Sequence, residues 1–404
     1  MKKRLLFLTV ATFLLMMGTM TACAAAGSEI QVPEITGLKQ FEVPDTEAMA
    51  FLRQMKAGWD LGNTFDATAD WLPGQQHGAG LETAWGNPAT RPELFQVLRE
   101  AGFGAVRIPV SWHNHVDARD QIDEGWMKRV REVAGYALEQ GMTVIVNVHH
   151  DNMEGYFIPD EAHMERSEQY LSAVWKQMAE AFADCDEHLI LESMNEPRLV
   201  GTNYEWYWDE NAALCQEAAR CINRLNQLFV DTVRATGGNN AKRYLSVPAY
   251  DASPYYAAHE AFQLPEDSAE NRLIVAAHGY IPYNFALNLN SSDKTFDLRK
   301  DTGKMAEIED FLTGLYDRFI SKGIPVMMDE FGALDKGGEL QDRVNFTAYY
   351  VAAASARGIP CFWWDNGLLN GKPTDEKFRL INRTTFAWDY PEIPMAMMKN
   401  LRKE

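Results

Sequence analysis

The sequence predicts an α/β fold, and within that class a (β/α)8 TIM barrel that forms a single domain. Eight short apolar runs each end in polar residues, which is typical of buried parallel strands. Amphipathic stretches of helical period lie between these runs, and a glycine often follows such a stretch, as at the end of a helix. Strand–helix alternation repeated eight times favours a closed parallel barrel over an open sheet.

The expected elements follow one another along the chain from residue 56. The strands are expected at 56–63, 105–109, 143–149, 189–195, 244–248, 273–278, 326–330 and 360–365. Helices are expected at 91–101, 124–140, 167–183, 211–235, 305–321 and 339–356. No GxGxxG motif follows the first strand, which argues against a dinucleotide-binding sheet. No Ser-rich or Pro/Thr-rich linker marks a second domain, so we expect one barrel domain over residues 46–404.

Two of the expected strands end in a glutamate. Glu196 follows the run that starts at Leu189, and Glu330 ends the run that starts at Val326. Barrel enzymes carry their chemistry at the carboxyl ends of the strands. Two facing carboxyls are the minimum requirement for cleaving a glycosidic bond. A single strand-end glutamate could equally pair with an arginine or cap a helix, but two at matching strand ends favour a catalytic pair.

Polar and aromatic residues also follow the other strands, where a core strand would carry Val, Ile or Leu. They are Asn63, Arg107, Trp112, His149, His150, Asn195, Tyr250, His278, Tyr280, Trp363 and Trp364. A nucleophilic carboxylate needs a donor such as Arg107 or Tyr280 to keep it ionised. The Asn195 amide could bind a sugar hydroxyl, and indole rings offer flat apolar faces to pyranose rings. The set predicts a polar cleft with aromatic walls.

Composition limits the partners of the protein. The chain has 404 residues, is 46% hydrophobic and carries a formal net charge of −19. This charge argues against nucleic acid or an anionic membrane as a partner, because phosphate binding needs basic patches. It suits a neutral substrate.

The cysteines show no metal-binding pattern. No CxxC spacing occurs, so a structural zinc site is not expected, and we expect buried free thiols at Cys185, Cys215, Cys221 and Cys361.

The N-terminus has the pattern of an export signal. Lys2-Lys3-Arg4 precedes an apolar run from Leu5 to Met17 that is too short to span a bilayer. We expect a signal peptide over 1–26, or a lipoprotein signal over 1–22 that leaves Cys23 to be lipidated. The protein would then be exported, as a cell-surface lipoprotein or in secreted form. Residues 27–45 are polar and contain prolines, and we expect them to be a tether.

From about residue 50 to the end, the chain resembles the family 5 glycoside hydrolases of clan A, the retaining endo-β-glucanases. The resemblance rests on nine strings in order: GWDLGNTFDA (58–67), TAWGNP (83–88), GFGAVRIPVSW (102–112), GMTVIVNVHHD (141–151), LILESMNEPR (189–198), VRATGGNN (233–240), AAHGYIPYNF (276–285), PVMMDEFGA (325–333) and CFWWDNG (361–367). The resemblance implies that Glu196 is the general acid/base and Glu330 the nucleophile. It implies supporting roles for Arg107, His149, Asn195, His278 and Tyr280, and substrate binding by Asn63, Asp66, His150 and a tryptophan of the last strand. Trp112 is expected to bind substrate as well, because its indole follows a strand end. Since neighbouring strand residues face opposite sides, only one of the two tryptophans points inward, and we favour Trp364 over Trp363.

Several alternatives stay open at this point. The same scaffold serves xyloglucanases, xylanases and mannanases, and we expect the loops at 71–80 and 200–211 to decide the preferred glycan. A non-catalytic glycan-binding lipoprotein is disfavoured because both glutamates are present. A metal hydrolase that uses His149, His150 and Glu196 is also disfavoured, since HxH and HExxH spacings are absent and adjacent strand residues point oppositely. We expect no metal, no cofactor, a polysaccharide substrate and a monomer.

Overall fold

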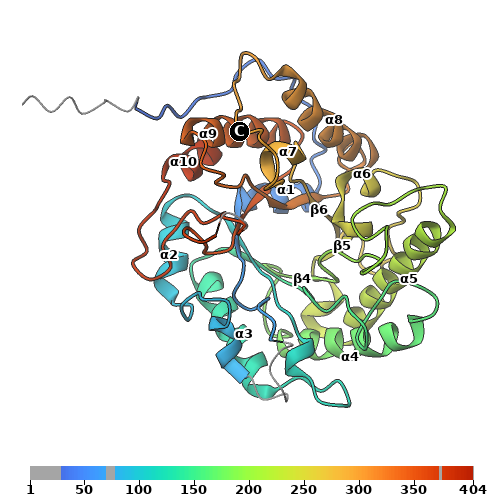
Figure 1. Ribbon diagram of the computed structural model, residues 1–404. Coiled ribbons are helices and arrows are strands. Elements are labelled where there is room, and N and C mark those ends of the chain that lie inside the picture. The colour runs from blue at the N-terminus through green and yellow to red at the C-terminus, as the bar shows by residue number, and fades with distance from the viewer. Residues whose placement is uncertain (1–28, 70–77, 373–374, 404) are drawn as a thin grey trace, which may run out of the picture. The chain divides into compact units, whose positions relative to one another are not determined.

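The computed structural model describes residues 29–69, 78–372 and 375–403. Eight parallel strands pair in chain order, and β8 pairs with β1 to close a barrel, which Figure 1 shows in a view into its interior. The strands are β1 (Gly58–Leu61), β2 (Ala105–Ile108), β3 (Thr143–Val146), β4 (Leu189–Glu192), β5 (Leu245–Pro248), β6 (Leu273–His278), β7 (Val326–Phe331) and β8 (Cys361–Asp365). The predicted (β/α)8 barrel is confirmed, with every strand at its expected place.

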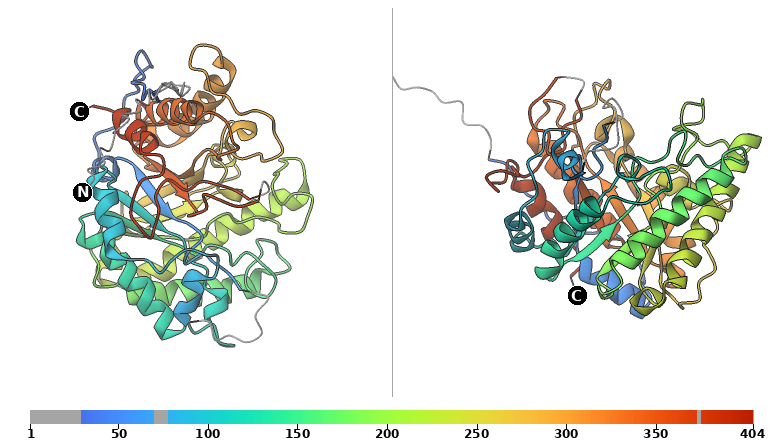
Figure 2. Two further views of the ribbon diagram at one scale, coloured as in Figure 1. Left: turned by 60° about the vertical axis from the view of Figure 1, so that its left-hand side comes forward. Right: turned by 90° about the horizontal axis from the view of Figure 1, so that it is seen from below.

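Helices surround the strands in all three views (Figures 1 and 2). Among the described residues they are α1 (Glu47–Met55), α2 (Pro92–Glu100), α3 (Glu124–Glu139), α4 (Met164–Ala181), α5 (Ala213–Ala235), α6 (Pro254–Ala257), α7 (Tyr283–Ala286), α8 (Thr302–Arg318), α9 (Leu340–Ser355) and α10 (Glu392–Lys399). Asp123 caps α3 by accepting the Trp126 N–H at 2.8 Å. None of the described helices is long and apolar enough to cross a membrane.

The strand register places polar side chains inside the barrel. Asp60 of β1 lies opposite Arg107 of β2 and Trp364 of β8, so these three side chains share one layer of the interior. Gly62 follows β1, and a Cβ there would lie 2.7 Å from the Trp364 ring, so only glycine leaves room for that indole. The register between β6 and β7 shifts after Ala277, and His278 then lies opposite Glu330. Such a bulge re-aims side chains beside an active site.

The predicted tether at residues 27–45 is largely wrong. Residues 31–404 form one compact unit, and the segment from residue 31 to residue 45 packs against α9 and α10. The Ile35 N–H donates to the Asn400 side chain at 2.8 Å, and the Phe41 N–H donates to the Ala356 carbonyl at 3.1 Å. The Phe41 ring is buried and contacts Tyr316 edge to face. Residues 1–28, with the predicted signal and Cys23, lie outside the described residues.

The described cysteines carry free thiols, as the sequence predicts. Cys215, Cys221 and Cys361 are buried, whereas Cys185 is partly exposed, so the predicted burial is wrong for Cys185. Burial raises the pKa of the Cys221 thiol to about 12, so this thiol is neutral and packs as a small apolar group.

Candidate active site

Glu196 and Glu330 meet at the carboxyl end of the barrel. Glu330 lies in β7, and Glu196 follows β4 by four residues. A carboxyl oxygen of Glu196, a carboxyl oxygen of Glu330 and a ring nitrogen of His278 all lie within 4.8 Å of one another. The Glu330 side chain is 6% exposed and the Glu196 side chain is 18% exposed, so both are shielded but reachable. The predicted pairing of the two strand-end glutamates is confirmed.

Two donors hold the Glu330 carboxylate. Arg107 Nη1 donates to Glu330 Oε1 at 2.7 Å, and the Tyr280 hydroxyl donates to Oε2 at 2.9 Å. His278 Nδ1 lies 3.7 Å from the same Oε2. Donors on both oxygens fix the orientation of this carboxyl group, and a carboxylate nucleophile needs such a fixed orientation.

Arg107 is the centre of a buried polar network. Its Nε and Nη2 form a two-point contact with Glu192 at 2.9 and 2.8 Å, and Nη2 also donates to Asn195 Oδ1 at 2.7 Å. The side chains of Arg107 and Glu192 are fully buried. The Asn147 amide donates to Glu192 as well, at 2.9 Å. Sequence reasoning missed Glu192, although a charged residue closing an apolar strand was a usable signal.

Glu196 is held by His278 on one side and Arg198 on the other. His278 Nδ1 lies 2.8 Å from Oε1, and Arg198 Nη1 lies 3.6 Å from Oε2. Burial alone would raise the Glu196 pKa, but the hydrogen bond and charge of His278 and the charge of Arg198 outweigh it and lower this pKa to about 2. Burial would lower the His278 pKa, but the charge of Glu330 and the hydrogen bond and charge of Glu196 raise it to about 9. Between these two pKa values, and without substrate, the Glu196 carboxyl is therefore ionised and the His278 imidazole is protonated.

Close backbone packing positions His278, the last residue of β6, and Tyr280, which follows it by two residues. Gly279 separates His278 from Tyr280, and a Cβ at Gly279 would lie 2.2 Å from the Tyr350 hydroxyl. That hydroxyl donates to the Gly279 carbonyl at 2.7 Å. Because only glycine fits against Tyr350, the segment turns so that His278 contacts Glu196 while Tyr280 contacts Glu330.

The predicted sugar-binding residues lie beside this pair. Trp364 faces the barrel interior and stacks parallel to His149 with 5.7 Å between ring centroids, whereas Trp363 is fully buried and donates to the Phe378 carbonyl. This supports the choice of Trp364. The imidazoles of His149 and His150 contact each other edge to face. Both residues lie beyond the end of β3, so strand alternation does not separate them. Burial lowers the His150 pKa to about 4.

Asp66 supports the site from below the surface. Its fully buried carboxylate accepts the N–H groups of Asn63 and Thr64 at 2.9 and 2.7 Å. Asn63 has a φ of 55°, a left-handed conformation that these bonds stabilise. The prediction that Asp66 binds substrate is therefore wrong, because its side chain has no exposed surface. Asn63 itself is partly exposed and remains a predicted sugar contact.

The prediction that Trp112 binds substrate is also wrong. Its side chain is fully buried, and its Nε1 donates to the Asn147 carbonyl at 2.9 Å. The Trp112 N–H donates to Asp151 at 3.0 Å. The residue follows β2 by four positions, where the loop and not the strand decides which way the side chain points. Trp112 thus packs below the site and has no surface for a sugar.

Two groups of side chains have the composition of metal ligands. One is the pair of glutamates with His278, and the other combines Asp66, His149 and His150. In the second group both Asp66 oxygens already accept backbone N–H groups, and His150 Nε2 lies 3.8 Å from the nearer oxygen. The carboxylates of the first group are bound by Arg107, Tyr280 and His278 instead.

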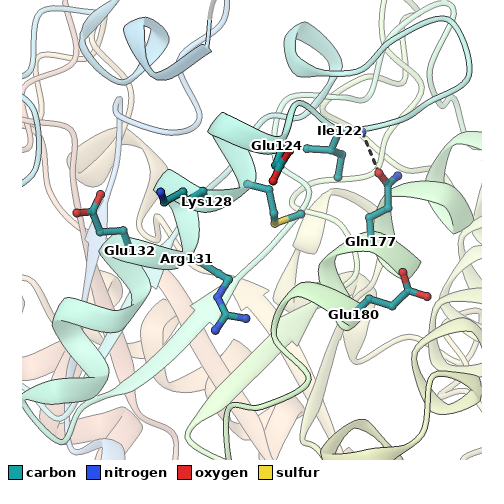
Figure 3. A pocket seen from close by; sticks show the side chains of 8 residues that line it. Ile122, Glu124, Lys128, Arg131, Glu132, Gln177 and Glu180 are labelled. Carbon is teal, nitrogen blue, oxygen red and sulfur yellow. Dashed lines mark hydrogen bonds between the residues drawn. The ribbon is translucent and has the colours of Figure 1, made fainter.

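A surface groove of about 600 Å³ lies elsewhere, between α3 and α4 (Figure 3). Gln177 accepts the Ile122 N–H at 2.9 Å across it. Its lining mixes charges of both signs without a buried polar group: Ile122, Glu124, Met127, Lys128, Arg131, Glu132, Gln177 and Glu180. It belongs to the outer face of the helix layer and adds nothing to the glutamate site.

Comparisons with known proteins agree with this geometry. Residues 66–369 match the family model of the cellulases, glycosyl hydrolase family 5. The chain is 42% identical over 358 residues to the cellulase/esterase CelE of Acetivibrio thermocellus, which covers 88% of this chain but only 40% of that protein. It is 39% identical to endoglucanase A of Ruminococcus albus, over 89% of this chain and 94% of that one. The family 5 lichenase of Caldicellulosiruptor sp. F32, solved with cellotetraose, is 45% identical and superposes with a TM-score of 0.89 over 93% of this chain and all of that one.

Proposed function

The chain belongs to glycosyl hydrolase family 5 and is a glycoside hydrolase, and on this premise we propose that it is a retaining endo-β-1,4-glucanase. Its substrates are cellulose-like and mixed-linkage β-glucans, with Glu330 as the nucleophile and Glu196 as the general acid/base. One observation carries the proposal: carboxyl oxygens of the two glutamates lie within 4.8 Å. Retaining enzymes hold their carboxyls about 5–5.5 Å apart, whereas inverting enzymes need about 6.5–9.5 Å to admit a water.

In the first step Glu330 attacks the anomeric carbon. The bond between that carbon and the glycosidic oxygen breaks, and Glu196 delivers a proton to the departing oxygen. Arg107 and Tyr280 hold the attacking carboxylate in place before the substrate arrives. Asn195, which is fixed by Arg107, carries an amide that binds a sugar hydroxyl. The product is a glycosyl ester on Glu330 with the configuration inverted once.

In the second step a water hydrolyses that ester. Glu196, now a carboxylate, takes a proton from the water, and the water oxygen bonds to the anomeric carbon as the ester bond to Glu330 breaks. Two inversions restore the original configuration.

A general acid works best with a pKa near the working pH, and the low pKa of Glu196 in the free protein does not meet this condition. His278, 2.8 Å away, holds the proton that Glu196 passes on when a sugar excludes water from the pair.

Substitution of each glutamate tests the two roles. Glu330→Ala should abolish hydrolysis, and added azide should restore turnover as an α-glycosyl azide. Glu196→Ala should lower kcat/KM on polysaccharide by about 100-fold or more, yet largely spare dinitrophenyl cellobioside, whose leaving group needs no proton. Glu139→Ala, on the exposed end of α3, is the matched control and should leave both activities unchanged. Equal losses on both substrates for Glu196→Ala would exclude the acid role.

The preferred glycan separates this proposal from its alternative, a xyloglucanase, xylanase or mannanase on the same barrel. In the loop between β4 and α5, Trp206 and Tyr207 are 61% and 60% exposed, which leaves large flat surfaces for a glycan chain. Residues 71–77 of the other loop lie outside the described residues. Product profiles on carboxymethylcellulose, barley mixed-linkage glucan, xyloglucan, xylan and mannan decide the matter. We expect the highest activity on the two glucans that lack side-chain sugars, and xylan or mannan as the best substrate would favour the alternative.

We also propose that the protein is exported and acts as a monomer anchored by a lipid at Cys23. The basic and then apolar N-terminus supports export, and Met20-Thr21-Ala22-Cys23 resembles a lipoprotein box. Cys23→Ser should move the protein from the membrane fraction of its host to the medium. If the wild type is already found wholly in the medium, the signal peptide over 1–26 is the correct interpretation. Sedimentation of the protein without its signal should give the mass of one chain.

A further inference from the structure

Arg198 connects the proposed acid to an exposed aromatic ring. It follows Glu196 by two residues and has a side chain that is only 16% exposed. Its Nη1 donates to the Glu196 carbonyl at 2.9 Å and lies 3.6 Å from Glu196 Oε2. The Arg198 N–H donates to Asn152 Oδ1 at 2.7 Å, which ties its backbone to the loop that follows β3. The backbone of Arg198 is thus fixed by Asn152, and its guanidinium lies beside the carboxyl group of Glu196.

The other side of the guanidinium covers Trp206. The guanidinium carbon lies 3.9 Å from the centroid of that ring, a cation–π contact at close range. Arg198 Nε lies 3.7 Å from Glu205 Oε1, and Glu205 Oε2 accepts the Gly201 N–H at 2.9 Å. Because Arg198 covers one face of an indole that is still 61% exposed, the opposite face is open to a ligand.

The two oxygens of Glu196 have different neighbours. Oε1 lies beside His278, which also lies near Glu330, so this oxygen is on the side of the anomeric carbon. Oε2 lies on the side of Arg198 and Trp206. A general acid protonates the bridging oxygen, and the sugar beyond that oxygen is the leaving group. The Arg198–Trp206 pair therefore lies where the leaving sugar is expected.

We propose that Arg198 is a positioning residue that couples the binding of the leaving sugar on Trp206 to the orientation of Glu196. A sugar on the open face of the indole holds the ring against the guanidinium, and the guanidinium holds the acid in line with the glycosidic oxygen. Neither contact requires Arg198 to touch the reacting atoms. The inference rests on the proposed function, because it assumes that Glu196 is the acid.

The coupling predicts a split between two kinds of substrate. Arg198→Met and Trp206→Ala should each lower kcat/KM on barley glucan about tenfold, while dinitrophenyl cellobioside, which has no leaving sugar and needs no proton, should change less than about twofold. Arg198→Lys keeps the charge but loses the planar face and should resemble Arg198→Met. The double variant should lose little more than either single variant, because the two residues act through one contact.

The controls separate this inference from the proposed function. Arg224→Met removes an arginine that pairs with Glu168 on the outer helices and should change neither activity. Activity on the aryl glycoside shows that each variant is folded. A wild type inactive on every β-glucan would overturn the proposed function itself. An active wild type with additive losses in the double variant, or equal losses on both substrates for Trp206→Ala, would overturn the coupling alone.

Discussion

At the residue scale, the site gathers several carboxyl groups around the side chains of Arg107 and His278. Arg107 faces Glu192 and Glu330, and His278 faces Glu196 and Glu330. Two further carboxyls, Asp60 and Asp329, are fully buried in the same interior. Burial raises the pKa of each well above its ordinary value, and the charges of Glu330 and Glu192 add to the effect at Asp60. Burial therefore favours the neutral form of both carboxyls over the charged form.

The raised His278 pKa predicts a pH dependence of stability. The folded state holds this proton more tightly than the unfolded state, because the pKa rises from 6.5 to about 9. The stabilisation is thus fully present below pH 6.5 and is lost as the pH rises through about 9. Urea unfolding should show the wild type more stable than His278→Gln at about pH 6, with a smaller gap at about pH 9.5. A gap of the same size at both pH values would contradict the pKa direction.

At the element scale, the strand ends were predictable and the loop side chains were not. The eight strands and the facing glutamates follow from apolar runs that end in polar residues, because parallel strands bring their carboxyl ends to one edge. Trp112 and Asp66 lie in loops, where hydrogen bonds to Asp151 and Asn63, and not alternation, set the direction of the side chain. The polar composition of 27–45 indicates a tether, because no local pattern reveals the hydrogen bond from Ile35 to Asn400, 365 residues further along the chain.

The packed N-terminal segment should contribute to stability. Phe41 is 8% exposed, and its ring centroid lies 4.7 Å from that of Tyr316. The guanidinium carbon of Arg357 lies 4.2 Å from the Phe41 centroid. Phe41→Ala should reduce the free energy of unfolding by about 3 kcal/mol, because it removes a large buried ring and leaves a cavity. Denaturant titration measures this loss. Gln40→Ala, on the exposed neighbouring residue, is the control and should change it by less than about 0.5 kcal/mol. Equal effects of the two substitutions would mean that the segment does not pack as described.

At the scale of the whole molecule, the protein carries a net charge of −19, whereas the proposed β-glucan substrate carries no charge. Long-range charge neither attracts nor repels a neutral glucan, whereas it repels an anionic one. Raising the salt from about 20 to about 200 mM should therefore change kcat/KM on barley glucan less than about twofold and raise it on carboxymethylcellulose, because salt screens the repulsion. Parallel assays on the two soluble glucans test this. The same salt response on both substrates would show that the charge of the protein does not act on the polymer.

The central claim is that Glu330 is the nucleophile and that Glu196 donates a proton in the first step and accepts one in the second. The most direct measurement is trapping of the covalent intermediate with an activated 2-deoxy-2-fluoro-cellobioside, followed by peptide mass spectrometry. The electron-withdrawing fluorine slows the hydrolysis of the glycosyl ester, so the ester accumulates on the nucleophile. We predict one cellobiosyl adduct per chain, on Glu330, and none in the Glu330→Ala variant. An adduct on Glu196, or inactivation without any adduct, would contradict the account.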